Sequence, residues 1–183
     1  MDDLVKAALL KWPNVPACRG WLALDARGEW FLRDEQAQAA GPFPGSKGSH
    51  IEHRKLREFI ERNYAADPDG AWFFQNGPQR VYVELEAAPW IWRLESAGAQ
   101  GGAVITSHTG LSARFSEALT DENGRLFLVT DRGLGLVHTQ DMAIAAEQID
   151  STVWALDGEL PFASLPGRYG FVLSPQAAAA ASH

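Results

Sequence analysis

Two histidines near hydroxyl and carboxyl groups come closest to a catalytic arrangement in this sequence. The residues that could complete a hydroxyl–histidine–carboxylate set with His108 or His138 are Ser107, Thr109, Asp131 and Asp141. Such a set performs acyl-transfer chemistry when the fold brings its members together. The chain contains no G-x-S-x-G pattern, which marks the sharp turn that exposes a nucleophilic serine. A hydrolase that uses a histidine of the second half is therefore our alternative hypothesis.

Two other motifs resemble binding sites but lack a required residue. His50 and His53 have the spacing of two metal ligands on a helix, but no third ligand follows at a matching spacing. The glycine-rich segment before them has Ser46 in front of Lys47, where a phosphate-binding loop needs glycine. We therefore predict no metal and no cofactor.

An aromatic cluster is the most unusual feature of the chain. Trp90 and Trp92 lie on one face of a predicted strand, because alternate residues of a strand point the same way. Such a cluster forms either a core or an aromatic-lined pocket with polar groups that orient a ligand. The residues that we predict for a ligand site, all aromatic or polar, are Trp72, Gln75, Gln79, Tyr82, Trp90, Trp92, Arg93, His108 and His138.

The elements that position these residues are short in the first half. The pattern predicts a helix over residues 2–11, a hairpin with strands 21–24 and 29–32, and strands 71–74, 80–85 and 90–94. Ser49 and Glu52 have the spacing of a capping box. This spacing predicts a helix that begins there and carries Leu56, Phe59, Ile60 and Tyr64 on one stripe.

The second half repeats this order. Leu111, Phe115, Ala118 and Leu119 have helical spacing, and strands are predicted over 125–129, 134–138, 153–156 and 169–173. The segment 140–149 is ambiguous between helix and strand. Three corners share the form D-x-x-G before an apolar strand, and they begin at Asp25, Asp67 and Asp121.

These repeats predict an α+β protein with largely antiparallel sheets, short helices and two related helix-plus-sheet lobes. We expect residues 1–97 to form the N-terminal helix, the hairpin and the first lobe. Residues 98–176 are expected to form the second lobe, and residues 177–183 a flexible tail. A groove between two such lobes is the place where we expect a ligand.

The order of helix, Asp67-x-x-Gly70 corner, aromatic strand from Trp72, Asn76-Gly77 turn and second strand resembles bacterial families known only as domains of unknown function. The resemblance extends over about residues 21–149 and includes no catalytic motif. It implies repeated helix-plus-sheet motifs in two similar lobes and a signalling or ligand-binding role.

Composition limits the partners. Sixteen basic residues against 23 acidic ones give a net charge of −7, which disfavours nucleic acid. Cys18 is the single cysteine, so we interpret it as a small apolar filler in a reducing compartment. An acidic start and no long apolar run favour a cytoplasmic protein without a membrane partner. We expect a noncatalytic module for a small molecule or a protein partner.

Overall fold

The computed structural model describes residues 1–98 and 102–181, which form two compact units. Unit 1 comprises Met1–Asp25, Glu29–Glu86 and the chain from Gly170 onward. Unit 2 comprises Ala26–Gly28 and Ala87–Tyr169. Each unit is built around one mixed sheet with short helices, so the predicted α+β class with two lobes is confirmed. None of the helices in the described ranges has the length and apolar character needed to cross a membrane.

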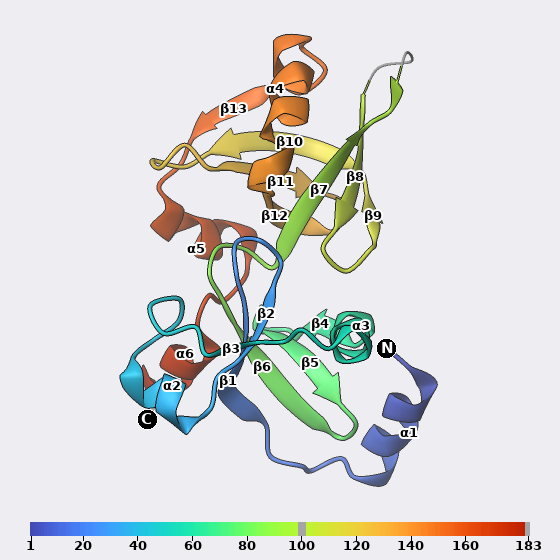
Figure 1. Cartoon of the computed structure of the whole chain (residues 1–183), viewed down its shortest axis with the longest axis vertical. Helices are drawn as coiled ribbons and strands as arrows, with labels where there is room; N and C mark the ends of the chain where they lie inside the picture. The colour runs from blue at the N-terminus through green and yellow to red at the C-terminus, as the bar shows by residue number, and fades with distance from the viewer. Residues whose placement is uncertain (99–101, 182–183) are drawn as a thin grey trace. The chain divides into compact units, whose positions relative to one another are not determined.

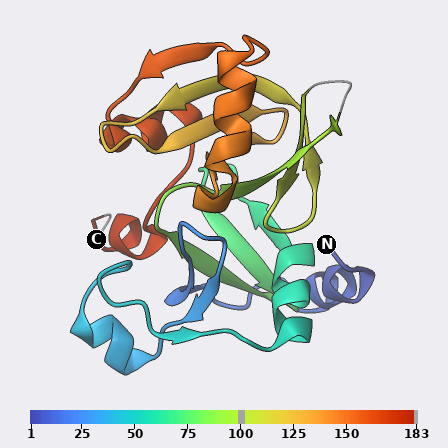
Figure 2. The same cartoon turned by 45° about the horizontal axis from the view of Figure 1, so that its top comes forward.

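Unit 1 contains a six-stranded sheet in the order β3-β2-β1-β6-β5-β4 (Figure 1). Its strands are β1 (Cys18–Leu24), β2 (Trp30–Leu32), β3 (Ser49–His50), β4 (Tyr64–Ala66), β5 (Trp72–Asn76) and β6 (Gln79–Leu85). Its helices are α1 (Asp3–Lys11), α2 (Glu35–Ala40), α3 (Arg54–Arg62) and α6 (Pro175–Ala181). Helix α3 packs against β5 (Figure 2), whereas α6 packs against β6 and β1.

Unit 2 contains a seven-stranded sheet in the order β13-β10-β11-β12-β7-β8-β9. Its strands are β7 (Trp90–Ser96), β8 (Ala103–Ser107), β9 (Ser112–Ala113), β10 (Phe115–Thr120), β11 (Leu126–Thr130), β12 (Gly133–Val137) and β13 (Leu156–Glu159). The helical segments are η2 (Thr139–Asp141), α4 (Met142–Asp150), η3 (Phe162–Ser164) and α5 (Leu165–Tyr169). Helix α4 packs against β7 and β8.

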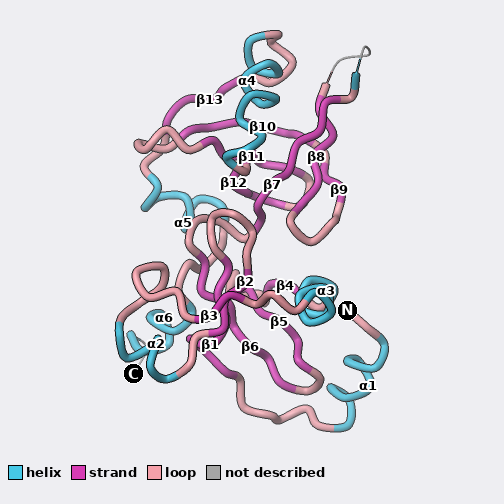
Figure 3. The backbone as a smooth tube through the Cα atoms, viewed as in Figure 1, coloured by secondary structure: helices cyan, strands magenta, loops and turns pink. Residues whose placement is uncertain are grey.

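The two sheets share one topology (Figure 3). In unit 1 the antiparallel meander β4-β5-β6 ends in β6, which pairs in parallel with β1. In unit 2 the antiparallel meander β10-β11-β12 ends in β12, which pairs in parallel with β7. Strands β1–β6 thus correspond in order to β7–β12, with β13 added at the edge of the second sheet. The internal repeat is present, but its copies begin at β1 and β7 instead of at the predicted helices.

Two of the three D-x-x-G corners, those at Asp67 and Asp121, occupy equivalent places in this repeat, whereas the corner at Asp25 joins β1 and β2. Asp67 Oδ1 accepts the backbone N–H groups two and four residues later at 3.0 and 2.9 Å. Asp121 Oδ1 does the same at 3.0 and 2.8 Å. Gly70 and Gly124 follow with φ of 81° and 71°. Glycine adopts this left-handed conformation without strain. Both corners join the first two strands of their meander, β4–β5 and β10–β11.

The first unit corrects one helix prediction and adds one helix. Ser49 and His50 form β3 against β2, so no capping box begins there. Helix α3 instead starts at Arg54, where His53 Nδ1 accepts the Leu56 N–H at 3.3 Å. The backbone of β2 pairs with Ser49 and His50, and the capping-box spacing gives no sign of this pairing. Tyr64 consequently lies in β4 and outside the helix, and α2 had no counterpart among the predicted elements.

The second unit contains two larger corrections. Residues 111–119, predicted as a helix, form β9 and most of β10, because β11 offers a long apolar strand to pair with. Residues 169–173, predicted as a strand, include the end of α5 and an irregular segment. Predicted strand 153–156 is displaced, since β13 begins at Leu156 and contains the Asp157-Gly158 pair that suggested a turn.

The predicted tail is partly helical. Helix α6 covers most of the segment 177–183, which was expected to be flexible. Residues 182 and 183 of that segment lie outside the described residues.

Candidate functional site

The nine predicted ligand residues divide between the two units. Four of them belong to unit 1, namely Trp72, Gln75, Gln79 and Tyr82, and five belong to unit 2, namely Trp90, Trp92, Arg93, His108 and His138. Within each unit, most of the polar groups among them are bonded to nearby backbone or side chains. The surroundings of these residues decide which of them remain available to a ligand.

Trp90 and Trp92 form part of the core of unit 2. Their rings stack with centroids 5.8 Å apart, and they are 6% and 0% exposed. Both indole N–H groups donate to backbone carbonyls, Trp90 to Arg132 at 2.8 Å and Trp92 to Leu128 at 3.1 Å. A buried Trp whose N–H is satisfied packs stably, so this pair is suited to holding the sheet together.

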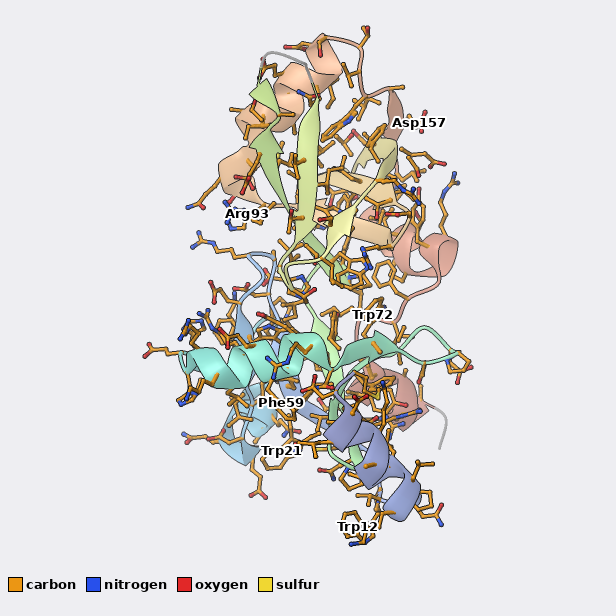
Figure 4. All side chains as sticks on the ribbon, turned by 90° about the vertical axis from the view of Figure 1, so that its right-hand side faces the viewer. Trp12, Trp21, Phe59, Trp72, Arg93 and Asp157 are labelled. Atoms are coloured by element: carbon orange, nitrogen blue, oxygen red, sulfur yellow. The ribbon has the colours of Figure 1, made fainter. Side chains whose placement is uncertain are left out.

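Arg93 holds the start of α4 on β7. Its guanidinium donates twice to the Asp141 carboxylate, with nitrogen–oxygen distances of 2.6 and 3.1 Å, and the Leu94 N–H donates to the same carboxylate at 3.0 Å. Burial alone would raise the pKa of Asp141, but these hydrogen bonds and the Arg93 charge lower it. The Arg93–Asp141 pair therefore connects β7 to the start of α4. Figure 4 labels Arg93, which belongs to unit 2.

The two histidines accept backbone hydrogen bonds. His108 Nδ1 accepts the Ile91 N–H at 3.3 Å, and burial lowers the pKa of His108 to about 3. His138 Nδ1 accepts the Gln140 N–H at 3.1 Å and thereby caps η2. A ring nitrogen that accepts a backbone N–H is fixed as an acceptor. In each ring, one of the two nitrogens is therefore committed to the backbone.

The hydroxyl beside His108 belongs to a turn. Ser107 Oγ lies 2.9 Å from Thr109 Oγ1 and accepts the N–H groups of Thr109 and Leu111 at 3.3 and 3.1 Å. These contacts explain Ser107 as a residue that stabilises the connection between β8 and β9. No group of three or more His, Cys, Asp or Glu side chains in residues 1–98 and 102–181 has the geometry to hold a metal ion.

In unit 1, the two predicted glutamines both donate to backbone carbonyls. The Gln75 side chain is 1% exposed and donates to the Gly77 carbonyl at 3.0 Å. Gln79 donates to the Pro16 carbonyl at 3.1 Å. Trp72 packs on Tyr64 with ring centroids 4.6 Å apart. Tyr82 differs, because its hydroxyl donates to Asp67 at 2.9 Å while its ring borders open space.

The apolar cavity of unit 1 lies where α3 crosses the sheet, and it was not predicted. Its volume is about 240 Å³. Its walls are mostly apolar side chains from α3, from the segment before it and from four strands, namely Cys18, Trp21, Leu22, Leu32, Ile51, Leu56, Ile60, Phe74, Asn76 and Val81. Figure 4 labels Trp21 on β1 and Phe59 on α3, whose ring meets Phe74 edge-on at 5.4 Å.

An irregularity in β1 lies beside this cavity. The register between β1 and β6 shifts between Cys18 and Leu22, and Gly20 has φ of 79°. A shift of this kind lets neighbouring residues face one side of a sheet. Trp21 and Leu22 consequently both line the cavity. The sequence signal was a glycine inside an apolar strand, which is typical of a bulge.

The described residues that line the cavity include no charged side chain. Burial raises the pKa of the Cys18 thiol, which keeps it neutral at physiological pH. Asn76, at the end of β5, is exposed and supplies an uncharged amide at the lining. The cavity thus combines apolar walls with one neutral hydrogen-bonding group, an arrangement typical of small-molecule sites.

Comparison with known families gives a match over most of the chain. The model of family DUF2944, described as "Protein of unknown function (DUF2946)", matches residues 1–176. The chain belongs to this family. The predicted resemblance to bacterial families of unknown function is confirmed at this level, whereas a signalling role finds no support in the comparisons.

Two solved structures resemble this DUF2944 member weakly. A DUF1285 family protein from Shewanella baltica OS155 is 14% identical with a TM-score of 0.48, and the match covers 70% of this chain and 91% of that one. A DUF1285 family protein from Silicibacter pomeroyi DSS-3 is also 14% identical with a TM-score of 0.48, with coverage of 80% and 84%. No curated protein matches the DUF2944 chain.

Proposed function

We propose that this protein is a noncatalytic binding module whose cavity in unit 1 takes a small uncharged molecule with an apolar body. The observation that carries the proposal is the cavity of about 240 Å³, whose described lining is mostly apolar and without a charged group. Apolar contact favours binding by about 25 cal/mol for each Å² removed from water. A charged ligand would lose its hydration without gaining an ionic partner.

The size of the cavity limits the ligand. Its volume is about 240 Å³. Since one water molecule occupies roughly 30 Å³ of the liquid, the cavity has the volume of about eight waters. This room suits a short aliphatic chain or a single ring. The Asn76 amide at the lining offers a partner to one neutral polar end, such as a hydroxyl group.

A series of straight-chain 1-alkanols tests the proposal. Affinity measured by amide chemical shifts should rise about fourfold for each added CH₂, since each buried CH₂ contributes ~0.8 kcal/mol, and should level off once the cavity is full. Hexanoate at neutral pH should bind far more weakly than 1-hexanol. Equal affinity of the two compounds, or no dependence on chain length, would contradict the proposal.

A filled cavity provides the matched control. Val81→Phe places a larger side chain in the cavity wall and should abolish alkanol binding. Val104→Phe makes the same change on β8 at a residue that is 48% exposed, and should leave binding unchanged. If alkanols bind folded Val81→Phe protein as tightly as wild type, the cavity beneath α3 is not their binding site.

Composition supports the remaining parts of the proposal. A net charge of −7 disfavours nucleic acid as the partner. The single cysteine suits a reducing, cytoplasmic environment. The hydrolase alternative would need His108 or His138 to act on a substrate. Replacing both with alanine would abolish any turnover that such an enzyme has.

A further inference from the structure

A second hollow lies on the opposite face of the unit 1 sheet. Val81 faces the apolar cavity, so Tyr82, the next residue of β6, faces the other side. This hollow has a volume of about 290 Å³ and is bordered by β1, β6, the β4–β5 corner and α6. Polar and apolar side chains both line it, which distinguishes it from the cavity beneath α3.

Arg19 provides the cationic group of the hollow. Its guanidinium carbon lies 4.5 Å from the centroid of the Tyr82 ring. The ring supports the guanidinium by cation–π attraction. Arg19 is exposed, and its guanidinium makes no hydrogen bond or ion pair with any residue in the described part of the chain. Its N–H donors are therefore available to a carboxylate.

Tyr82 is itself held in position from the other side. Its hydroxyl donates to Asp67 Oδ2 at 2.9 Å, and Asp67 Oδ1 accepts the backbone N–H groups of Asp69 and Ala71. Burial and the neighbouring Asp67 raise the pKa of Tyr82, so the phenol stays protonated. The D-x-x-G corner thus fixes the ring on which Arg19 rests.

Asp69 provides an anionic group in the same hollow. It is exposed at the corner, and it lines the hollow together with Arg19. A ligand with only negative charge would be repelled by Asp67 and Asp69, and one with only positive charge would be repelled by Arg19. The rest of the lining consists of small or apolar residues, namely Ala71, Val172, Pro175, Ala178 and Ala179.

We propose that this hollow binds a small aliphatic zwitterion of the amino-acid type. The ligand's carboxylate accepts hydrogen bonds from Arg19, its ammonium group pairs with Asp69, and its side chain lies against the alanines of α6. Planar guanidinium and carboxylate groups match in geometry, which gives Arg an advantage over Lys here. The site is independent of the apolar cavity, so either proposal can fail alone.

The test uses the full chain and three probes in an amide chemical-shift titration. L-leucine carries both charges, 4-methylpentanoate lacks the ammonium group, and isopentylamine lacks the carboxylate. Leucine should bind at least about tenfold more tightly than either analogue, because charge-assisted hydrogen bonds form at both ends. The shifted amides should belong to β1, β6 and α6. If leucine binds no better than both analogues, or none of the probes binds, the proposal is wrong.

Variants separate the site from the general charge of the protein. Arg19→Gln should weaken leucine binding about tenfold or more, and Arg19→Lys should weaken it as well because the planar fork is lost. Arg54→Gln removes the same charge from an exposed position of α3 and should have no effect. Asp69→Asn should weaken leucine but not 4-methylpentanoate. Equal losses in Arg19→Gln and Arg54→Gln would contradict the assignment.

Discussion

Gly135 in β12 gives the sharpest prediction about stability. It pairs with Trp90 across the parallel contact between β12 and β7. A Cβ atom at this position would overlap Nε1 of Trp92 and would lie only 2.7 Å from Cβ of Trp90. Trp92 is fully buried, so its ring has no room to turn away without disturbing the core. Gly135→Ala must therefore displace the tryptophan pair.

The expected cost combines two effects. Overpacking a dense core costs about 1–3 kcal/mol. Moving the Trp92 ring also breaks its hydrogen bond to the Leu128 carbonyl. A buried donor left without an acceptor costs about 1–3 kcal/mol. Because partial relaxation relieves some of each, we expect Gly135→Ala to lower the free energy of unfolding of unit 2 by about 3 kcal/mol.

Urea unfolding measures this cost. The signals of unit 2 amides should be followed, since tryptophans in both units would mix the transitions in fluorescence. Gly167→Ala is the matched control, because Gly167 lies in α5 with no atom within 4 Å of the added Cβ. The control should be neutral or slightly stabilising. A Gly135→Ala protein within about 0.5 kcal/mol of wild type would show that the tryptophan packing described above is incorrect.

Three further predictions concern charged and titratable groups of unit 2. Asp121 is a fully buried carboxylate that accepts two backbone N–H groups and pairs with Arg125. Asp121→Ala should cost about 3 kcal/mol in urea unfolding, and a loss below about 1 kcal/mol would refute this role. The folded-state pKa of Asp141 is lowered, so its contribution is present at neutral pH and disappears as the pH falls. The difference in the free energy of unfolding between wild type and Arg93→Met should shrink below about pH 4. A difference that does not change with pH would contradict this role of the Arg93–Asp141 pair. The pKa of His108 is lowered from 6.5 to about 3, so the unfolded chain binds more protons between these two values. Wild type should lose stability as the pH falls through this range, and His108→Gln should lose less. Parallel curves of unfolding free energy against pH for the two proteins would refute the lowered pKa of His108.

The sequence predicts best the elements that are determined by residues close to each other in the chain. The hairpin between β1 and β2 and the strands around Asn76-Gly77 follow from apolar runs that flank a turn. The corners at Asp67 and Asp121 follow from the side chain that satisfies its own turn. These signals depend on residues within a few positions of each other, and tertiary packing reinforces them.

The errors arose where pairing with a distant strand decides the structure. Leu119 has helical spacing with its neighbours, but it pairs with Phe127 in a buried ladder. His50 pairs with Phe31, which lies in a strand well before it in the chain. Local pattern does not contain these partners, and sheet pairing overrides weak helical propensity.

The candidate site could be predicted only in part. Tyr82 was among the predicted ligand residues and lines the hollow on the α6 face. The cavity beneath α3 was missed because it depends on the shift in β1 and on the crossing of α3, neither of which has a clear pattern. Trp90 and Trp92 are unusual in the sequence as two large aromatic residues on one strand, but both are buried in the core of unit 2.

The path of the chain has a practical consequence for dissecting the molecule. The Leu85 N–H donates to the Leu173 carbonyl at 2.8 Å, so the strand that leaves unit 1 and the segment that returns to it are backbone neighbours. Residues 87–169, which make up unit 2 apart from Ala26–Gly28, are therefore inserted between two segments of unit 1. Excision with a short linker from Glu86 to Gly170 should preserve the six-stranded sheet with α6, whereas truncation after residue 97 would leave one face of that sheet bare.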